Sequence, residues 1–182
     1  MKSVLISIQP RWCELIASGR KTVEVRKTRP KIETPFRVYI YCTKGKFEPH
    51  EQLRNNLHYD DSTIKVCEGQ GKVIGEFVCN SIGQTSWYIT PNDTLWKDAF
   101  DEESCLTNRE LYEYSNGGLF YEWYISDLVI YNKPRELSDF YVWKKCNSCR
   151  DTGYESTACC YDEDCRVPAV ITRPPQSWCY VE

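Results

Sequence analysis

Residues Gly19–Arg26 read Gly-Arg-Lys-Thr-Val-Glu-Val-Arg, and the architecture is easiest to infer outward from this octapeptide. Its second half alternates valines with charged residues, which is typical of a strand with one face in a core. We therefore expect Val23 and Val25 to point into the core. Glu24 and Arg26 should lie on the opposite face, where charged side chains are available for chemistry.

The elements around this strand are short. Pro10 suits the first position of a helix, and Gly19 suits the left-handed residue that ends one. A second helix is expected over residues 108–115, because Thr107 and Glu110 have the spacing of a capping box. Further strands are expected over residues 4–8, 36–42, 72–82 with a bulge at Gly75, 119–131 before a turn at 132–134, and 169–181 bent at Pro174-Pro175.

This element order favours the α+β class, mainly β. About six strands, two or three short helices and no β-α-β rhythm predict a small mixed β-barrel. The chain has 182 residues, of which 41% are hydrophobic, so we expect a single domain spanning residues 1–182.

Composition also limits the function classes. Met1 to Pro10 does not resemble a secretion leader, and no apolar run approaches the roughly 18 residues that span a bilayer, so we expect a cytoplasmic protein without membrane contact. The net charge is −3 with a sequence pI of about 5.6. A strongly basic nucleic-acid binder is therefore excluded, and any nucleic-acid contact must be local.

Gly19, Lys21, Glu24 and Arg26 occupy the four fixed positions of the pattern Gly-x-Lys-x-x-Glu-x-Arg. The chain thereby resembles the ASCH domain family of the PUA-like superfamily. The opening strand that ends in Ile-x-Pro and the closing stretch 172–178, Thr-Arg-Pro-Pro-Gln-Ser-Trp, extend this resemblance over most of the chain. It implies a PUA-like barrel whose cleft, beside the first helix, binds RNA or a modified nucleoside or nucleotide.

The residue types suit such a cleft. Lys21 supplies a cation, Glu24 an acceptor and Arg26 a bidentate donor fork, a set that can read a base edge and a phosphate. The alternative is an exposed Glu24–Arg26 ion pair without function, contributing about 0.2–1 kcal/mol. The closing stretch adds three candidate ligand-binding residues, Arg173, Ser177 and Trp178. Of these, Trp178 could stack on a base or simply fill the barrel.

Resemblance to a small amidohydrolase that deacetylates N4-acetylcytidine gives a second hypothesis. It would make Lys21 the nucleophile or base, with Glu24 or Glu76 moving the proton. That enzyme has a threonine where this chain has Glu24. A carboxylate beside the lysine stabilises the ammonium form, so the sequence favours binding over catalysis; if the protein is an enzyme, we expect an amidohydrolase.

Eleven cysteines in a chain without a secretion leader point to reduced thiols or a metal site. Residues 144–168 form a cysteine-rich insert in which two pairs of thiolates can meet across a polar loop, as in a structural zinc knuckle. The expected ligands are Cys146, Cys149, Cys160 and Cys165, with Cys159 as an alternative to Cys160. Unmetallated thiols are the other interpretation, and a zinc-stabilised protein-interaction module is the third functional hypothesis. The remaining cysteines are scattered, and those that fall in helices or strands are expected to act as small core hydrophobes.

Overall fold

The computed structural model describes residues 2–46, 66, 68–86, 100–146 and 165–182. Strands predominate over helices, which confirms the predicted mainly β architecture. In chain order the elements are β1 (Ser3–Ile8), α1 (Pro10–Ala17), β2 (Val23–Arg26), β3 (Phe36–Cys42), β4 (Val73–Thr85), β5 (Phe100–Asp101), β6 (Leu106–Thr107), α5 (Asn108–Ser115), β7 (Phe120–Arg135), the 3-10 helix η1 (Leu137–Asp139), β8 (Tyr141–Lys145), β9 (Arg166–Val170) and β10 (Trp178–Val181).

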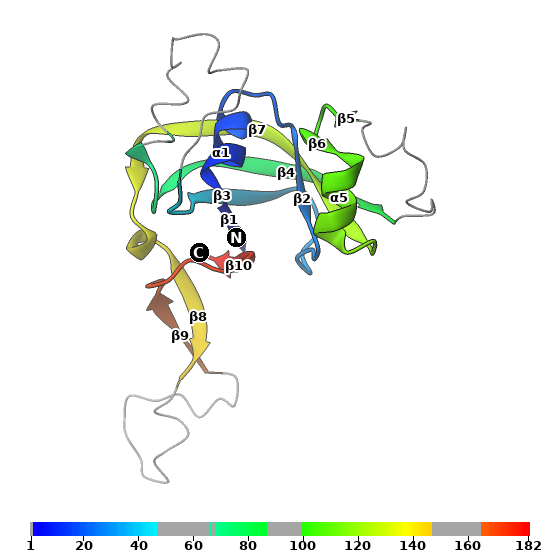
Figure 1. The fold of residues 1–182 in the computed structure, drawn as a ribbon. Coiled ribbons are helices and arrows are strands. Elements are labelled where there is room, and N and C mark those ends of the chain that lie inside the picture. The colour runs from blue at the N-terminus through cyan, green and yellow to red at the C-terminus, as the bar shows by residue number, and fades with distance from the viewer. Residues whose placement is uncertain (1, 47–65, 67, 87–99, 147–164) are drawn as a thin grey trace, which may run out of the picture.

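Six strands form one mixed sheet in the order β10-β1-β3-β4-β7-β2. Only β1 and β3 pair in parallel, and the other neighbours are antiparallel. The long strands β4 and β7 cross the body of the molecule, while β8 and β9 project from it as a separate two-stranded ribbon (Figure 1). None of the helices in the described ranges is both long and apolar enough to cross a membrane.

The sheet curls until its two edges approach each other. Trp178 Nε1 on β10 donates to Thr28 Oγ1 at 3.0 Å, and Lys31 N donates to Tyr180 Oη at 2.6 Å. Within the described residues no backbone ladder joins β2 to β10. The barrel therefore closes through side-chain contacts between residues 28–31 and β10, which we call the seam.

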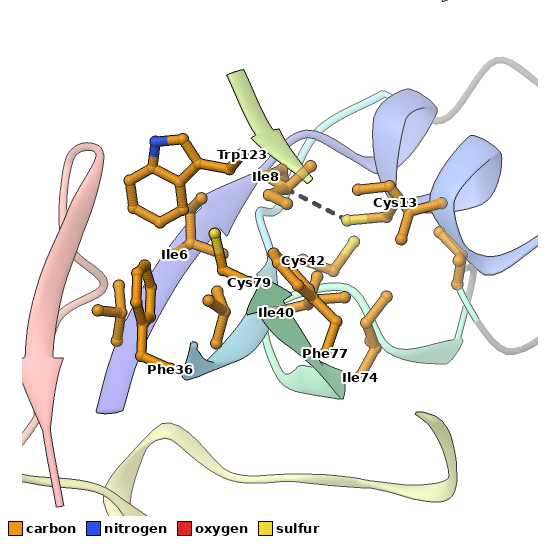
Figure 2. Close-up of a cluster of buried hydrophobic side chains, with 14 residues drawn as sticks. Ile6, Ile8, Cys13, Phe36, Ile40, Cys42, Ile74, Phe77, Cys79 and Trp123 are labelled. Atoms are coloured by element: carbon orange, nitrogen blue, oxygen red, sulfur yellow. Dashed lines mark hydrogen bonds between the residues drawn. The ribbon is translucent and has the colours of Figure 1, made fainter. Parts of the chain in front are cut away.

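The main core lies inside this curled sheet (Figure 2). Ile6, Phe36 and Trp123 come from three different strands, and the Phe36 and Trp123 rings meet edge to face at 5.8 Å. Their burial removes apolar surface from water and holds the curl. The hydrophobic members not yet named include Val4, Ile8, Ile16, Val38, Ile40, Val66, Ile74 and Phe77.

Three of the scattered cysteines are fully buried in this core, as predicted: Cys13, Cys42 and Cys79. The Cys13 thiol donates to the Ile8 carbonyl at 3.5 Å. Burial raises the pKa of Cys79 to about 12 and raises that of Cys13 well above its ordinary value. These groups pack as neutral hydrophobes.

Several local features of the fold were predicted correctly from short stretches of the sequence. Gly19 has a φ of +75° after α1, and α5 begins with the expected capping box between Thr107 and Glu110. At Gly75 the register of β4 against β7 shifts, and the two backbones approach so closely there that an added Cβ would meet the Val129 carbonyl oxygen. The predicted bulge is confirmed.

Two strand predictions were wrong in extent. β7 runs on through Arg135, beyond the turn expected at 132–134, because Val73 pairs with Arg135 and continues the β4 ladder. The strand expected over 169–181 is two strands that belong to different sheets. Pro174 and Pro175 lie between them and cannot donate backbone hydrogen bonds to a ladder.

Candidate ligand-binding cleft

A cleft of about 920 Å³ opens beside α1, between β2 and α5. Residues 174–177, which lead into β10, form the facing wall. Four of the residues selected from sequence line this cleft: Lys21, Glu24, Arg26 and Ser177. The sequence therefore identified its floor and part of its wall.

The turn after α1 sets the position of Lys21. Gly19 N donates to the Ile16 carbonyl, and Lys21 N donates to the Leu15 carbonyl, both at 2.9 Å. The positive φ of Gly19 allows this reversal, which would strain a residue with a Cβ. Gly19 does not itself line the cleft, so its contribution is to direct the chain.

The charged side chains form a chain of contacts centred on Glu24. Arg26 Nη2 lies 3.0 Å from Glu24 Oε1, and Lys21 Nζ lies 3.6 Å from Glu24 Oε2. Arg26 Nη2 also donates to the Ser7 carbonyl at 2.7 Å, and Lys21 Nζ donates to the Ser104 carbonyl at 2.6 Å. Glu24 thus holds two cations in fixed positions, each also bonded to the backbone.

Burial of these side chains rules out the exposed ion pair considered from sequence. The side chains of Lys21, Glu24 and Arg26 are 2%, 8% and 9% exposed. All four residues of β2 are buried, so the face expected to meet solvent is covered by the walls of the cleft. Desolvating three charges is expensive, and paired geometry only partly offsets the cost. Such a cluster is typical of a functional site.

The cluster contains more hydrogen-bond donors than acceptors. Both oxygens of Glu24 face cations, whereas the buried Arg26 Nε has no hydrogen-bond partner among the described residues. An unsatisfied buried N–H costs about 1–3 kcal/mol. The excess of cationic donors over acceptors around Glu24 suits a ligand that presents acceptors, such as carbonyl oxygens or ring nitrogens.

Two aromatic side chains line the cleft that were not selected from sequence. Trp12 lies on α1, where its ring is 5.3 Å from Lys21 Nζ, and Tyr114 lies on α5, where its ring is 5.2 Å from Lys27 Nζ. Burial raises the pKa of the Tyr114 phenol, so its hydroxyl stays protonated at neutral pH. No local pattern could have selected them, because Trp12 also packs against the main core and Tyr114 lies far from the octapeptide in the sequence.

The formal charge of the cleft lining is balanced. Three cations, Lys21, Arg26 and Lys27, face three carboxylates, Glu24, Glu110 and Glu113. A long polyanion gains little from a neutral surface, because phosphate binding depends on net positive charge. The lining suits a neutral or singly charged ligand better than an RNA backbone.

Three other residues selected from sequence lie outside the lining of this cleft. Trp178 contributes to the seam and packs against Trp123, with ring centroids 6.2 Å apart. Arg173 precedes the wall formed by residues 174–177. Glu76, on β4, accepts from Tyr131 Oη at 2.6 Å and lies 3.5 Å from Arg37 Nη1. Glu76 is therefore not brought together with Lys21.

The ribbon brings two of the predicted zinc ligands together. Cys146 N donates to the Cys165 carbonyl at 3.0 Å where the paired part of β8 and β9 ends. In the part of the chain that the structure describes, no group of three or more metal-binding side chains is present. The remaining predicted ligands lie outside the described residues: Cys149, Cys159 and Cys160.

Comparison with known proteins agrees with this architecture. The family model of the ASCH domain matches residues 6–140, which is more than half of the chain. The protein belongs to the ASCH domain family, and its curled mixed sheet has the corresponding PUA-like fold. No curated protein sequence matches the chain.

The chain is also similar to solved structures. It aligns with the crystal structure of ASCH from Zymomonas mobilis at 19% identity and a TM-score of 0.53, covering 99% of this chain and 87% of that one. A serine-to-alanine mutant of the same Zymomonas mobilis protein gives 19% identity and a TM-score of 0.53, covering 99% and 88%. At this identity the likeness concerns the fold alone.

Proposed function

We propose that the cleft binds a nucleoside, a nucleotide or a single base of an RNA, with Lys21 and Arg26 donating to the base edge. The observation that carries the proposal is the convergence of three charged side chains, two of them cationic hydrogen-bond donors, on the lining of one cleft. Pyrimidine and purine edges offer the carbonyl oxygens and ring nitrogens that such donors recognise. Membership of the ASCH domain family supports the same ligand class.

The aromatic residues of the cleft support a planar ligand. Trp12 and Tyr114 come from two different helices and line the same space, so a base can stack on either ring. Stacking is worth about 1–3 kcal/mol per base and tolerates any base. Selectivity would then depend on Lys21 and Arg26, while the neutral lining limits the length of nucleic acid that the cleft alone can bind.

Calorimetric titration of the intact protein with the common nucleosides, their monophosphates and N4-acetylcytidine tests this function. At least one should bind, and Arg26→Lys should weaken binding about tenfold or more, because a lysine cannot replace the bidentate guanidinium fork. Arg37→Ala removes an arginine that also pairs with a glutamate but lies outside the cleft, and it should bind like the wild type. Absence of binding to the whole panel would refute the proposal.

The geometry gives less support to hydrolysis by Lys21. Its Nζ already donates to the Ser104 carbonyl and faces Glu24, and Glu76 lies outside the cleft. A nucleophilic amine needs a free lone pair directed at the substrate. We therefore propose recognition rather than hydrolysis. Release of acetate from N4-acetylcytidine, lost in Lys21→Ala, would overturn this choice.

We also propose a structural zinc ion bound by cysteines of the ribbon. The hydrogen bond between Cys146 and Cys165 supports it, because a knuckle needs its two ligand pairs held at the same end of a hairpin. Metal analysis of protein purified under reducing conditions should give about one zinc per chain. Cys146→Ser together with Cys149→Ser should lose it, whereas Cys79→Ser removes a core cysteine and should retain it.

A further inference from the structure

The ribbon formed by β8 and β9 has an aromatic and basic face. Its register places Tyr141 opposite Val170, Trp143 opposite Pro168 and Lys145 opposite Arg166. Alternate residues along a strand, and residues directly opposite on its partner, share one face of a ribbon. Two aromatic rings and two cations therefore follow one another along the same side.

This face is open to solvent. Tyr141 and Trp143 are 43% and 48% exposed, although large aromatic side chains usually gain stability from burial. The indole Nε1 of Trp143 donates to Glu182 Oε2 at 2.7 Å, and this bond fixes the ring by its edge. Fixing the edge holds the ring in place and leaves the indole face available for contact.

The charge of the ribbon differs in sign from that of the whole chain. Its strands, Tyr-Val-Trp-Lys-Lys and Arg-Val-Pro-Ala-Val, contain Lys144, Lys145 and Arg166 and no acidic residue, in a protein of net charge −3. Exposed aromatic rings interleaved with cations are the combination that binds single-stranded nucleic acid, because bases stack on the rings and phosphates pair with the cations.

We propose that the ribbon is a second binding site, distinct from the cleft, for single-stranded nucleic acid. Tyr141 and Trp143 stand two residues apart on β8, which is about 7 Å along a strand. Each ring can then accept one base of an extended strand. Lys145 and Arg166, farther along the same face, contact the phosphates. The neutral cleft lacks this net positive charge, so the two sites differ in the part of the nucleotide that they bind.

Fluorescence anisotropy of a labelled single-stranded uridine 12-mer tests the proposal on the full chain. Trp143→Ala should weaken binding about tenfold, and Trp143→Phe should restore most of it, since stacking needs a ring. Phe100→Ala removes a 56% exposed aromatic residue on β5 and should change nothing. The double variant Lys145→Ser, Arg166→Ser should lower the slope of log affinity against log salt by about 1.4, for two phosphate contacts.

Two results would overturn the ribbon site. One is absence of binding to the 12-mer at about 50 mM salt. The other is a Trp143→Ala variant that binds as the wild type does. Either result can be distinguished from refutation of the proposed cleft function. Titration with nucleosides reports binding in the cleft alone, and it should be unaffected by Trp143→Ala.

Discussion

At the scale of single residues, Glu24 is the centre of the site. Its carboxylate lies between Lys21 and Arg26, and its side chain is 8% exposed. It is therefore the shared counterion that offsets the cost of burying these two cations. Its role is to position the donors, since both of its oxygens already face a cation. Residue identity at this point therefore affects both stability and recognition.

Removal of that carboxylate should be costly. Glu24→Ala leaves Lys21 and Arg26 buried without their shared counterion, and we expect a loss of roughly 3–5 kcal/mol in the free energy of unfolding. Urea denaturation measures the loss. Lys72→Ala breaks an exposed pair with Glu136 at 2.8 Å and should cost at most about 1 kcal/mol. Equal losses in the two variants would contradict the importance of burial.

The core thiols should resist alkylation. Cys13 and Cys79 are fully buried, and burial raises the pKa of both, so almost no thiolate forms near neutral pH. We expect their peptides to remain unmodified when native protein is treated with iodoacetamide at about pH 8, as read by mass spectrometry. The same peptides should react after denaturation in guanidinium. Equal labelling of native and denatured protein would show that these thiols are accessible.

Three charged residues of the cleft were selected from the sequence, but its other charged residues and its aromatic walls were not. Lys21, Glu24 and Arg26 belong to one local pattern, so their spacing alone indicated a shared surface. Trp12 and Tyr114 come from helices about a hundred positions apart in the chain, and only the fold shows that they face one cleft. Trp178 was selected as a stacking residue for its chemistry, but its place in the seam depends on long-range packing.

At the scale of elements, α5 forms a wall of the cleft, and its first turn is held by a reciprocal cap. Glu110 N donates to Thr107 Oγ1 at 3.2 Å, and Thr107 N donates to Glu110 Oε2 at 2.8 Å. Thr107→Ala should therefore cost about 1 kcal/mol of unfolding free energy. Urea denaturation of this variant beside Glu113→Ala, which lies in the same helix outside the cap, checks the effect; equal midpoints would contradict it.

Elements with a local signal were predicted well. The helix cap at Thr107, the turn at Gly19 and the bulge at Gly75 each depend on a few neighbouring residues. The extent of β7 depends instead on its pairing with β4, and no local pattern shows that Val73 meets Arg135. The ribbon was missed as an element because β8 is short and exposed, so it lacks the alternating apolar pattern of a core strand.

At the scale of the whole molecule, the stability of the curled sheet should not depend on the proposed zinc site, although the base of the ribbon shares a second buried cluster with the sheet through Val142, Leu5 and Tyr41. The core cluster around Cys13 and Trp123 contains none of the predicted zinc ligands. We therefore expect Cys146→Ser with Cys149→Ser to leave the thermal midpoint of the sheet within a few degrees of the wild type, by near-ultraviolet circular dichroism of the core tryptophans. A large fall in the midpoint would mean that the metal site supports the whole fold.

The seam has a consequence for how the molecule moves. The hydrogen bonds that join its two borders involve the side chains of Trp178, which donates, and Tyr180, which accepts, so separating the borders does not break a ladder. The barrel can open locally along the seam while the remaining strands stay paired. Trp178→Phe removes one donor and should speed amide hydrogen exchange in β10, whereas Tyr124→Phe, on β7, should not; unchanged exchange would argue against it. A ligand that contacts both Arg26 and residues 174–177 would hold the two edges of the sheet together and oppose this opening.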